Sequence, residues 1–361
     1  MSSAFPSSIH TSPIVKHALT GVAVSHLSHL GAVVTLYILV QRIIPSDQTV
    51  KRQIAFTAAC LHIISPAGIF LSSPYGESTF AFTAFLGILC YVRAQEHSFL
   101  PAQQSALPTA VWTILSGLSF AISTLIRSNG LLHGTIFLID ALTTLRAMLI
   151  TRKAVHFFHL SSIVIAGSFI ALAFALPQTI AYYEFCTPFK TRPWCSYRIP
   201  SIYSWVQKHY WNVGFLSYWT PGNIPLFLVA APMLVILSAT ALLVYSKPNQ
   251  MLASVNGGTN KPSSKAEAAL FTHVVSQLAI PQLILATMSL TSFHVQIINR
   301  ISSGCALWYL ILAIAVNDRR ADRWEAIWGV LGGGRVELVV RLMVAYAIVQ
   351  GGLYAAFLPP A

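Results

Sequence analysis

A small set of charged and polar residues interrupts an otherwise apolar sequence, and these residues are the candidates for chemistry. Glu77 follows the segment 73–76, Ser-Pro-Tyr-Gly; Arg127 opens the run Arg-Ser-Asn-Gly; and His294 begins a polar run that ends at Arg300. A carboxylate in apolar surroundings is costly to desolvate, so such a residue is expected to pair with a cation or to have a raised pKa. Arginine can hold a phosphate with two donors. These residue types suit a site that binds a phosphate or a sugar.

Each candidate also has a purely structural explanation. Glu77 could be a solvated helix end, where the helix dipole favours a carboxylate, and Asn129 with Gly130 suits a tight turn. Arg127 could bind phosphate or reach from a membrane interface toward water. On a regular helix Arg300 would lie beside Gln296, either as a donor pair for a ligand or as a polar helix start. The sequence leaves these alternatives open.

The segment 177–222 is a long polar interval that is rich in Trp and Tyr. Such side chains have an apolar body and a polar tip, which suits a membrane–water interface. They could equally line a site for a ligand that is part sugar and part lipid. Within this segment Trp211 and Asn212 are the candidate stacking and polar contacts.

The spacing of the cysteines allows one disulfide, and the spacing of the histidines does not indicate a metal site. Cys186 and Cys195 lie nine positions apart in the aromatic segment, so a disulfide is feasible there if the segment faces an oxidising compartment. The other cysteines lie in or beside apolar segments and suit packing. Histidine pairs lack carboxylate partners, and we therefore predict no metal site.

The composition is that of an integral membrane protein. Hydrophobic residues make up 55% of the 361 residues and charged residues only 9%, with a mean hydropathy of +0.66, whereas soluble domains carry about 25% charged residues. The net charge of +12 is not arranged in a groove-reading cluster, which argues against nucleic-acid binding. Repeated apolar runs predict an all-α polytopic membrane protein with about ten transmembrane helices in one domain over 1–361. The expected spans are roughly 17–40, 54–71, 78–92, 109–126, 130–150, 155–176, 223–246, 269–291, 297–316 and 336–357.

The distribution of Lys and Arg predicts the orientation. The loops on one side hold fourteen of these residues and are expected to face the cytosol. The loops on the other side hold six, namely Arg127, Lys190, Arg192, Arg198, Lys208 and Arg300. All the compact polar motifs and the aromatic segment 177–222 fall on this second side, which is then luminal or extracellular. The segment 247–266, rich in Pro, Gly, Asn and Ser, predicts a flexible cytosolic linker.

Two classes of function fit this arrangement. An enzyme acting on a lipid-linked substrate needs a polar site at one membrane face, which is where the motifs gather. A transporter favours broken helices, charge at the membrane midplane and internal repeats, and the sequence shows little of these. A non-catalytic subunit is a third possibility, and the enzyme is favoured.

The motifs resemble, in order from about residue 20 to the C-terminus, those of the second GPI mannosyltransferases, the phosphatidylinositol glycan class V family. Jointly they are specific, although each alone would be weak. They are Ser65-Pro66 with Phe70-Leu71 and Tyr75 to Ser78, Arg127 to Gly130, Pro193-Trp194-Cys195, Pro200 with Ile202-Tyr203, Tyr210 to Leu216, Asn223 with Pro225, Ala231-Pro232, His294 to Gln296 with Arg300, and Trp308-Tyr309.

The resemblance implies a multi-pass enzyme of the endoplasmic-reticulum membrane with a GT-C-type glycosyltransferase fold. It would transfer the second, α-1,6-linked mannose from dolichyl-phosphate mannose to a GPI precursor on the luminal side. A carboxylate base would activate the acceptor, and cations would stabilise the departing phosphate. No cofactor is expected beyond the donor substrate, and a small accessory membrane subunit is a possible partner. The substrate-binding residues implied are Tyr75, Glu77, Arg127, Asn129, Trp211, Asn212, His294, Gln296 and Arg300.

The sequence departs from the family pattern before Ala18. Family members begin with a further span and a luminal Trp-Asp motif, whose Asp is the expected base, and neither is found upstream of Ala18. We therefore name no catalytic residue and expect the sequence to correspond to a family member without roughly its first quarter. The alternatives are an N-terminally shortened, inactive homologue and a membrane transporter.

Overall fold

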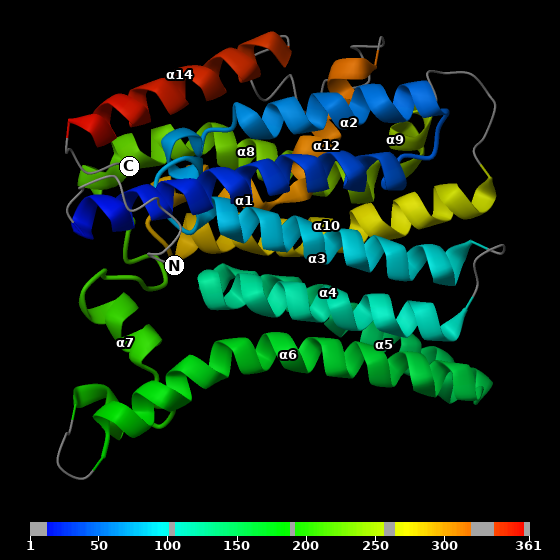
Figure 1. The fold of residues 1–361 in the computed structure, drawn as a ribbon, viewed down its shortest axis with the longest axis horizontal. Helices are drawn as coiled ribbons and strands as arrows, with labels where there is room; N and C mark the ends of the chain where they lie inside the picture. Colours follow the sequence, from blue (N-terminus) through cyan, green and yellow to red (C-terminus); the bar gives the residue numbers. More distant parts are fainter. Residues whose placement is uncertain (1–12, 101–104, 188–191, 256–263, 319–335, 357–361) are drawn as a thin grey trace.

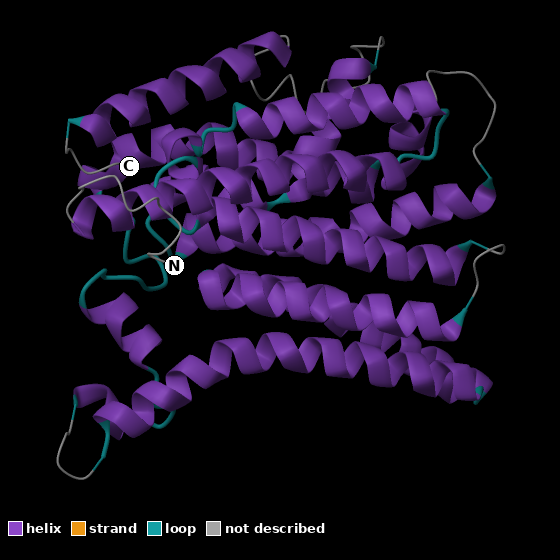
Figure 2. Ribbon diagram, in the orientation of Figure 1, coloured by secondary structure: helices purple, strands orange, loops and turns teal. Residues whose placement is uncertain are grey.

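A computed structural model describes residues 13–100, 105–187, 192–255, 264–318 and 336–356. Within these ranges the chain is helical and contains no strand, which confirms the predicted all-α class (Figure 2). The long elements are α1 (Pro13–Ile43), α2 (Gln48–Ile63), α3 (Glu77–Phe99), α4 (Ala106–Ile126), α5 (Gly134–Thr151), α6 (Ala154–Phe185), α8 (Ile224–Ser246), α10 (Lys265–Thr291), α12 (Ala306–Asn317) and α14 (Val336–Ala355).

Most of these helices run roughly parallel or antiparallel to one another, with their ends at two opposite faces of the molecule (Figure 1). By length and composition, seven of the described helices could cross a membrane, and a bent pair near residue 305 makes an eighth. The chain is therefore a multi-pass membrane protein. The helix α2 has 16 residues, fewer than the ~20 that a perpendicular crossing needs, and one of its faces packs on α1 and α12.

Close helix contacts depend on small residues. A Cβ added at Gly117 of α4 would lie 2.6 Å from the Cα of Ala166 in α6, so the two backbones touch at this point. Small residues allow such close approach where both helices are surrounded by lipid and the hydrophobic effect does not drive association. This contact fixes the end of α4 relative to α6, and both helices contribute to the site described below.

A buried polar network joins three helices in the middle of the bundle. The carboxylate of Asp140 in α5 accepts hydrogen bonds from Tyr91 (2.8 Å) and Gln95 (3.2 Å) of α3 and from Gln277 (2.8 Å) of α10. Both carboxylate oxygens are thus engaged. Asp140 thus ties α5 to its neighbours α3 and α10.

The expected span at 297–316 is not one straight helix. The segment Val295–Gly304 comprises η7 (Val295–Ile297), α11 (Ile298–Ile301) and η8 (Ser302–Gly304), and it meets α12 at 79°. The Phe80 ring packs so closely against Gly304 that any side chain there would collide with it. Residues 295–297 form a 3-10 turn and α11 begins only at Ile298, so Gln296 and Arg300 do not lie on one regular helix.

Two loop predictions also need correction. The helix α6 continues through Pro177 to Phe185, so the aromatic segment leaves the helix at Cys186 and not at residue 177. It then contains η5 (Pro193–Ser196), α7 (Ile202–His209) and η6 (Pro221–Asn223).

The predicted flexible linker 247–266 begins with a helix. The short α9 (Pro248–Val255) buries Met251 and Val255 against the bundle, so this part is packed in spite of its loop-like composition. Residues 256–263 lie outside the described part of the chain.

Candidate active site

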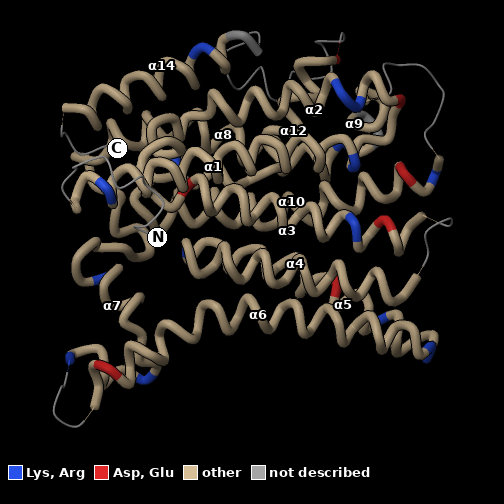
Figure 3. Tube along the Cα trace, in the orientation of Figure 1, with Lys and Arg blue, Asp and Glu red and all other residues tan. Residues whose placement is uncertain are grey.

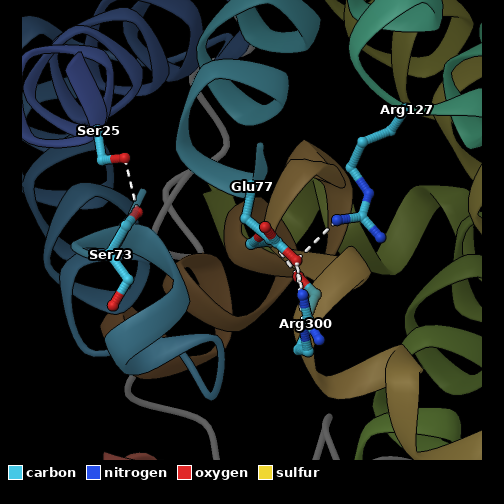
Figure 4. A network of polar contacts seen from close by, with 6 residues as sticks. Ser25, Ser73, Glu77, Arg127 and Arg300 are labelled. Carbon is cyan, nitrogen blue, oxygen red and sulfur yellow. Dashed lines mark hydrogen bonds and ion pairs between the residues drawn. The ribbon is translucent and has the colours of Figure 1, made fainter. Parts of the chain in front are cut away.

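Three charged side chains from distant parts of the sequence meet at one end of the bundle (Figure 4). Glu77 is the first residue of α3, Arg127 follows the last turn of α4, and Arg300 lies in the short α11. Glu77 Oε1 accepts hydrogen bonds from Arg127 Nη1 at 2.7 Å and from Arg300 Nε and Nη2 at 3.0 and 2.5 Å. The loop before α3 is held by Ser25 of α1, whose hydroxyl donates to the Ser73 carbonyl at 2.6 Å.

The charges of this cluster do not cancel. The side chains of Glu77, Arg127 and Arg300 are 0%, 20% and 16% exposed, and together they carry one net positive charge. Burial lowers the pKa of the Arg127 guanidinium, while the Glu77 carboxylate acts in the opposite direction; arginine nevertheless stays protonated in proteins. A buried excess of positive charge is stabilised by an anion. The cluster can therefore receive a phosphate.

Aromatic rings hold Arg300 in place. Its guanidinium lies 3.8 Å from the centroid of the Phe70 ring in η2 (Gly68–Leu71) and 5.1 Å from that of Tyr75. Tyr354 of α14 packs edge-on against both rings. Cation–π contacts of this kind favour a fixed guanidinium position, so Tyr75 acts on Arg300 and through it on Glu77.

A cavity of about 510 Å³ opens beside Arg127. Its polar lining residues are Arg127, Ser128, Asn129, Tyr203, Gln207, Trp211 and His294, and its apolar ones are Leu131, Leu132, Phe174, Val213, Met288, Phe293, Ile297 and Ile301. This mixture of a few polar groups in an apolar wall is typical of ligand sites. It is also what an amphipathic ligand with a charged group and a hydrocarbon part requires.

A second cavity, of about 400 Å³, shares the wall formed by Arg127, Ser128, Asn129, Phe174 and Tyr203. Its remaining lining is contributed by the ends of α3, α4 and α6, and it includes the Gln178 amide. The hydroxyls of Ser128 and Tyr203 are 2.7 Å apart and hydrogen-bonded. Because both residues line both cavities, this hydrogen bond belongs to the partition between them.

The aromatic segment is fastened to the end of α10 next to the first cavity. His294 Nε2 lies 2.5 Å from the Trp211 carbonyl oxygen, and the imidazole stacks on the Tyr218 ring with centroids 4.6 Å apart. Trp219 Nε1 donates to the Leu290 carbonyl at 2.8 Å. His294 is thus placed to set the position of Trp211 at the cavity wall.

A disulfide fixes the N-terminal end of the aromatic segment. Cys186 and Cys195 form a disulfide with their Cα atoms 5.6 Å apart. Gln178 of α6 accepts hydrogen bonds from the Ser201 hydroxyl and the Tyr203 backbone N–H, both at 3.1 Å. The disulfide and the Gln178 contacts join the start of α7 to the end of α6, which positions Tyr203 over the cavities.

Comparison with known proteins decides the family. A model of the mannosyltransferase (PIG-V) family matches residues 8–361. The chain belongs to this family. The resemblance read from the motifs is therefore confirmed, and the chain is a member of a family of glycosyltransferases.

Individual PIG-V relatives are similar over nearly the whole chain. GPI mannosyltransferase 2 of Aspergillus oryzae is 41% identical over 346 residues, which cover 95% of this chain and 74% of that protein. The proteins of the same name from Gibberella zeae and Candida albicans are 39% and 30% identical, each over 95% of this chain and 75% and 74% of their own length. No solved structure matches the chain significantly.

The structure brings most of the predicted PIG-V site residues together. Tyr75, Glu77, Arg127 and Arg300 form the charged cluster. Arg127, Asn129, Trp211 and His294 line the first cavity. These residues come from two loops, the aromatic segment and the broken span, which the sequence alone does not place side by side.

Two predicted contacts lie elsewhere. Asn212 is exposed, has a left-handed φ of 48° and does not line the cavity, so its backbone shapes a turn. Gln296 also lies outside the cavity lining, and its Oε1 is buried without a hydrogen-bond partner among the described residues.

Sequence reasoning missed several lining residues. Tyr203 and Gln207 both line the first cavity from α7, and Phe174 lines it from α6. Tyr203 and Gln207 are four positions apart on a short helix and therefore lie on one face. This spacing is the signal that could have identified them. No sequence signal marks Phe174, which looks like any other apolar residue of a membrane helix.

Proposed function

We propose that this chain is a GPI mannosyltransferase that adds the second, α-1,6-linked mannose to a GPI precursor. The donor is dolichyl-phosphate mannose, and the reaction takes place on the luminal side of the endoplasmic-reticulum membrane. The single observation that carries the proposal is the pair of half-buried arginines on the buried Glu77, beside a half-apolar cavity, in a chain whose relatives are named GPI mannosyltransferase 2.

The arginines suit the leaving group of this reaction. When the bond between mannose and phosphate breaks, negative charge grows on the dolichyl phosphate. Preorganised cations in a partly buried site stabilise such charge more than they stabilise the ground state. Arg127 lines the cavity and contacts the phosphate in this scheme, while Arg300, which donates to the same Glu77 oxygen, contributes its charge.

Glu77 orients the two cations in this scheme. Its Oε1 already accepts three hydrogen bonds from arginines, and its side chain is fully buried. A general base must reach a proton of the acceptor, and Glu77 is not a lining residue of the first cavity. We therefore assign it to positioning and name no base.

The polar side of the first cavity suits the sugars. Trp211 and Tyr203 offer ring faces for stacking, and Ser128, Asn129 and Gln207 offer hydrogen-bonding groups for hydroxyls. In the proposal these residues face the mannose and the acceptor glycan. No cofactor is needed, because the donor carries its own leaving group, and a small accessory membrane subunit is a candidate partner.

Transport of a lipid-linked sugar is the second candidate function. The broken span at residue 305 and the buried Asp140 are features that transporters share. Vesicles containing the purified protein would separate the two functions. Flux of the lipid-linked sugar without any glycosyl product supports transport, whereas a mannosylated product supports the transferase.

The proposed reaction is tested in cells depleted of their own second GPI mannosyltransferase. The unchanged protein should restore growth. It should also convert the GPI precursor with one mannose into the form with two, as seen by chromatography of labelled lipids. A protein changed at Glu77→Gln, Arg127→Ala and His294→Ala together should accumulate the one-mannose precursor. Normal growth and a normal lipid profile with all three changes would contradict the site assignment.

A further inference from the structure

An apolar groove of about 340 Å³ runs along the outside of the bundle between α5 and α6. Leu138 of α5 and Val164 of α6 stand at its rim, with 59% and 53% of their surface exposed. Its floor includes Gly134 and Gly167, which are half-buried. The groove therefore faces the hydrocarbon of the membrane and is lined almost entirely by apolar groups.

The groove lies next to the first cavity. Leu131, in η4 (Ser128–His133), lines both. On α6 the groove ends at Ala171, and Phe174 of the cavity wall lies about one turn further along the helix. From Gly134 the groove follows α5 away from the cavity to Ala141, a distance of about 10 Å at the helical rise.

The glycines leave real space in the groove floor. A Cβ built on Gly134 meets Ile170 Cγ2 at 3.9 Å, and one built on Gly167 meets Phe137 Cβ at 3.8 Å, both ordinary van der Waals distances. At Gly117, in contrast, a Cβ would collide with the backbone of α6. The groove glycines are therefore not required for helix contact, and their effect is to leave a channel open.

We propose that this groove binds the first isoprenoid units of the lipid-phosphate donor while its phosphate lies at Arg127. The proposal rests on the proposed function and adds the binding site of the donor lipid. The groove offers an apolar surface next to the cavity that Arg127 lines, so a hydrocarbon chain attached to a phosphate at Arg127 can enter it. The lipid of a GPI precursor is separated from the reacting hydroxyl by several sugars, so it need not lie beside the reacting phosphate.

The test compares donors of different chain length. Microsomes containing the unchanged protein, or its Gly167→Leu or Gly134→Leu variant, are assayed with dolichyl-phosphate mannose and with an analogue in which a methyl group replaces the dolichyl chain. Gly352→Leu in α14 is the matched control, because nothing lies within 4 Å of a Cβ there. Filling the groove should raise the KM for the long-chain donor about tenfold, as expected from the loss of a few buried methylene contacts. The KM for the methyl donor, which has no chain to place in the groove, and kcat should not change.

The possible results separate the groove from the reaction. Equal KM changes for both donors, or none for either, would overturn the groove assignment while leaving the transferase intact. If the unchanged protein transfers mannose from neither donor, the proposed function fails and the groove proposal fails with it.

A photo-crosslinking measurement covers the case in which the variants do not fold. A polyisoprenyl phosphate with a diazirine on its second isoprenoid unit is bound to the unchanged protein, and the labelled peptides are sequenced. Labels at Leu138 or Val164 support the groove. Labels confined to α14 or to α1 would overturn it.

Discussion

At the scale of single residues, the site depends on one carboxylate that two arginines share. Arg127 and Arg300 are separated from Glu77 by 50 and 223 positions, so no spacing rule could have predicted their pairing. The sequence did identify all three as unusual charges on the side that is poor in Lys and Arg. It could not show that Glu77 faces the arginines, because a helix start in solvent would have the same local sequence.

The first prediction concerns the shared carboxylate. Glu77→Gln keeps the shape of the side chain but leaves two buried cations without a counter-charge, which should cost about 3 kcal/mol of folding free energy and lower the Tm. Glu96→Gln is the matched control, because Glu96 also pairs with two arginines, Arg42 and Arg93, whose side chains are 39% and 31% exposed. Thermal unfolding in detergent measures both variants. Equal decreases in Tm would show that the burial of the Glu77 cluster does not increase its contribution to stability.

The second prediction concerns the wall of the first cavity. His294→Ala removes the ring that stacks on Tyr218 and the hydrogen bond to the Trp211 carbonyl. Mannosyl transfer should fall about tenfold, which corresponds to one lost hydrogen bond and its stacking contact, while the Tm changes little. His294→Phe keeps the stacking alone and should give intermediate transfer. Full activity of the alanine variant would show that Trp211 does not need this support.

At the scale of elements, the structure differs from sequence expectation where a helix continues or stops against its local signals. Pro177 suggested the end of α6, yet the helix continues for two turns. The contacts of Gln178 with the aromatic segment and the disulfide at Cys186 hold this extension. The apolar run 297–316 predicted one span, and the close contact of Phe80 with Gly304 accompanies a bend that no local signal marks. The bend places Arg300 beside Glu77, so the main failure of the span prediction occurs at the site.

The third prediction tests the packing that positions Arg127 at the end of α4. Gly117→Ala places a methyl group 2.6 Å from the Ala166 backbone, so α4 and α6 must separate. The expected cost is about 1–3 kcal/mol of stability, together with reduced transfer, because Arg127 and Phe174 shift relative to each other. Gly352→Ala in α14 has open space and is the control. Indistinguishable Tm values for the two variants would rule out a tight α4–α6 contact.

At the scale of the whole molecule, charge is distributed unequally between the two ends of the bundle (Figure 3). Lys and Arg gather at the end where α2, α6 and α10 begin, whereas α7, Glu77 and Arg127 lie at the other end. The class of fold and this asymmetry were predictable, because composition and loop charge determine them. The grouping of helices around the cavities was not, since apolar helix faces look alike whether they meet lipid or protein.

The fourth prediction tests this orientation in sealed microsomes. A membrane-impermeant maleimide should label Lys153→Cys, which is exposed at the basic end, without permeabilisation. Tyr210→Cys, at a position 68% exposed in the aromatic segment, should be labelled only after the membrane is opened. Labelling of the unchanged protein gives the background from its own cysteines, and this background is subtracted. The opposite pattern would place the site on the cytosolic side.

The central claim is that Arg127 binds the phosphate of the donor, supported by the charge of Arg300, and substitution of Arg127 tests it most directly. Transfer of mannose from dolichyl-phosphate mannose is measured in microsomes that contain the unchanged protein, the Arg127→Ala variant or the Arg127→Lys variant. The account predicts that kcat/KM for the donor falls about a hundredfold in Arg127→Ala and partly recovers in Arg127→Lys, which keeps the charge. Unchanged donor kcat/KM in a folded Arg127→Ala protein would contradict the account.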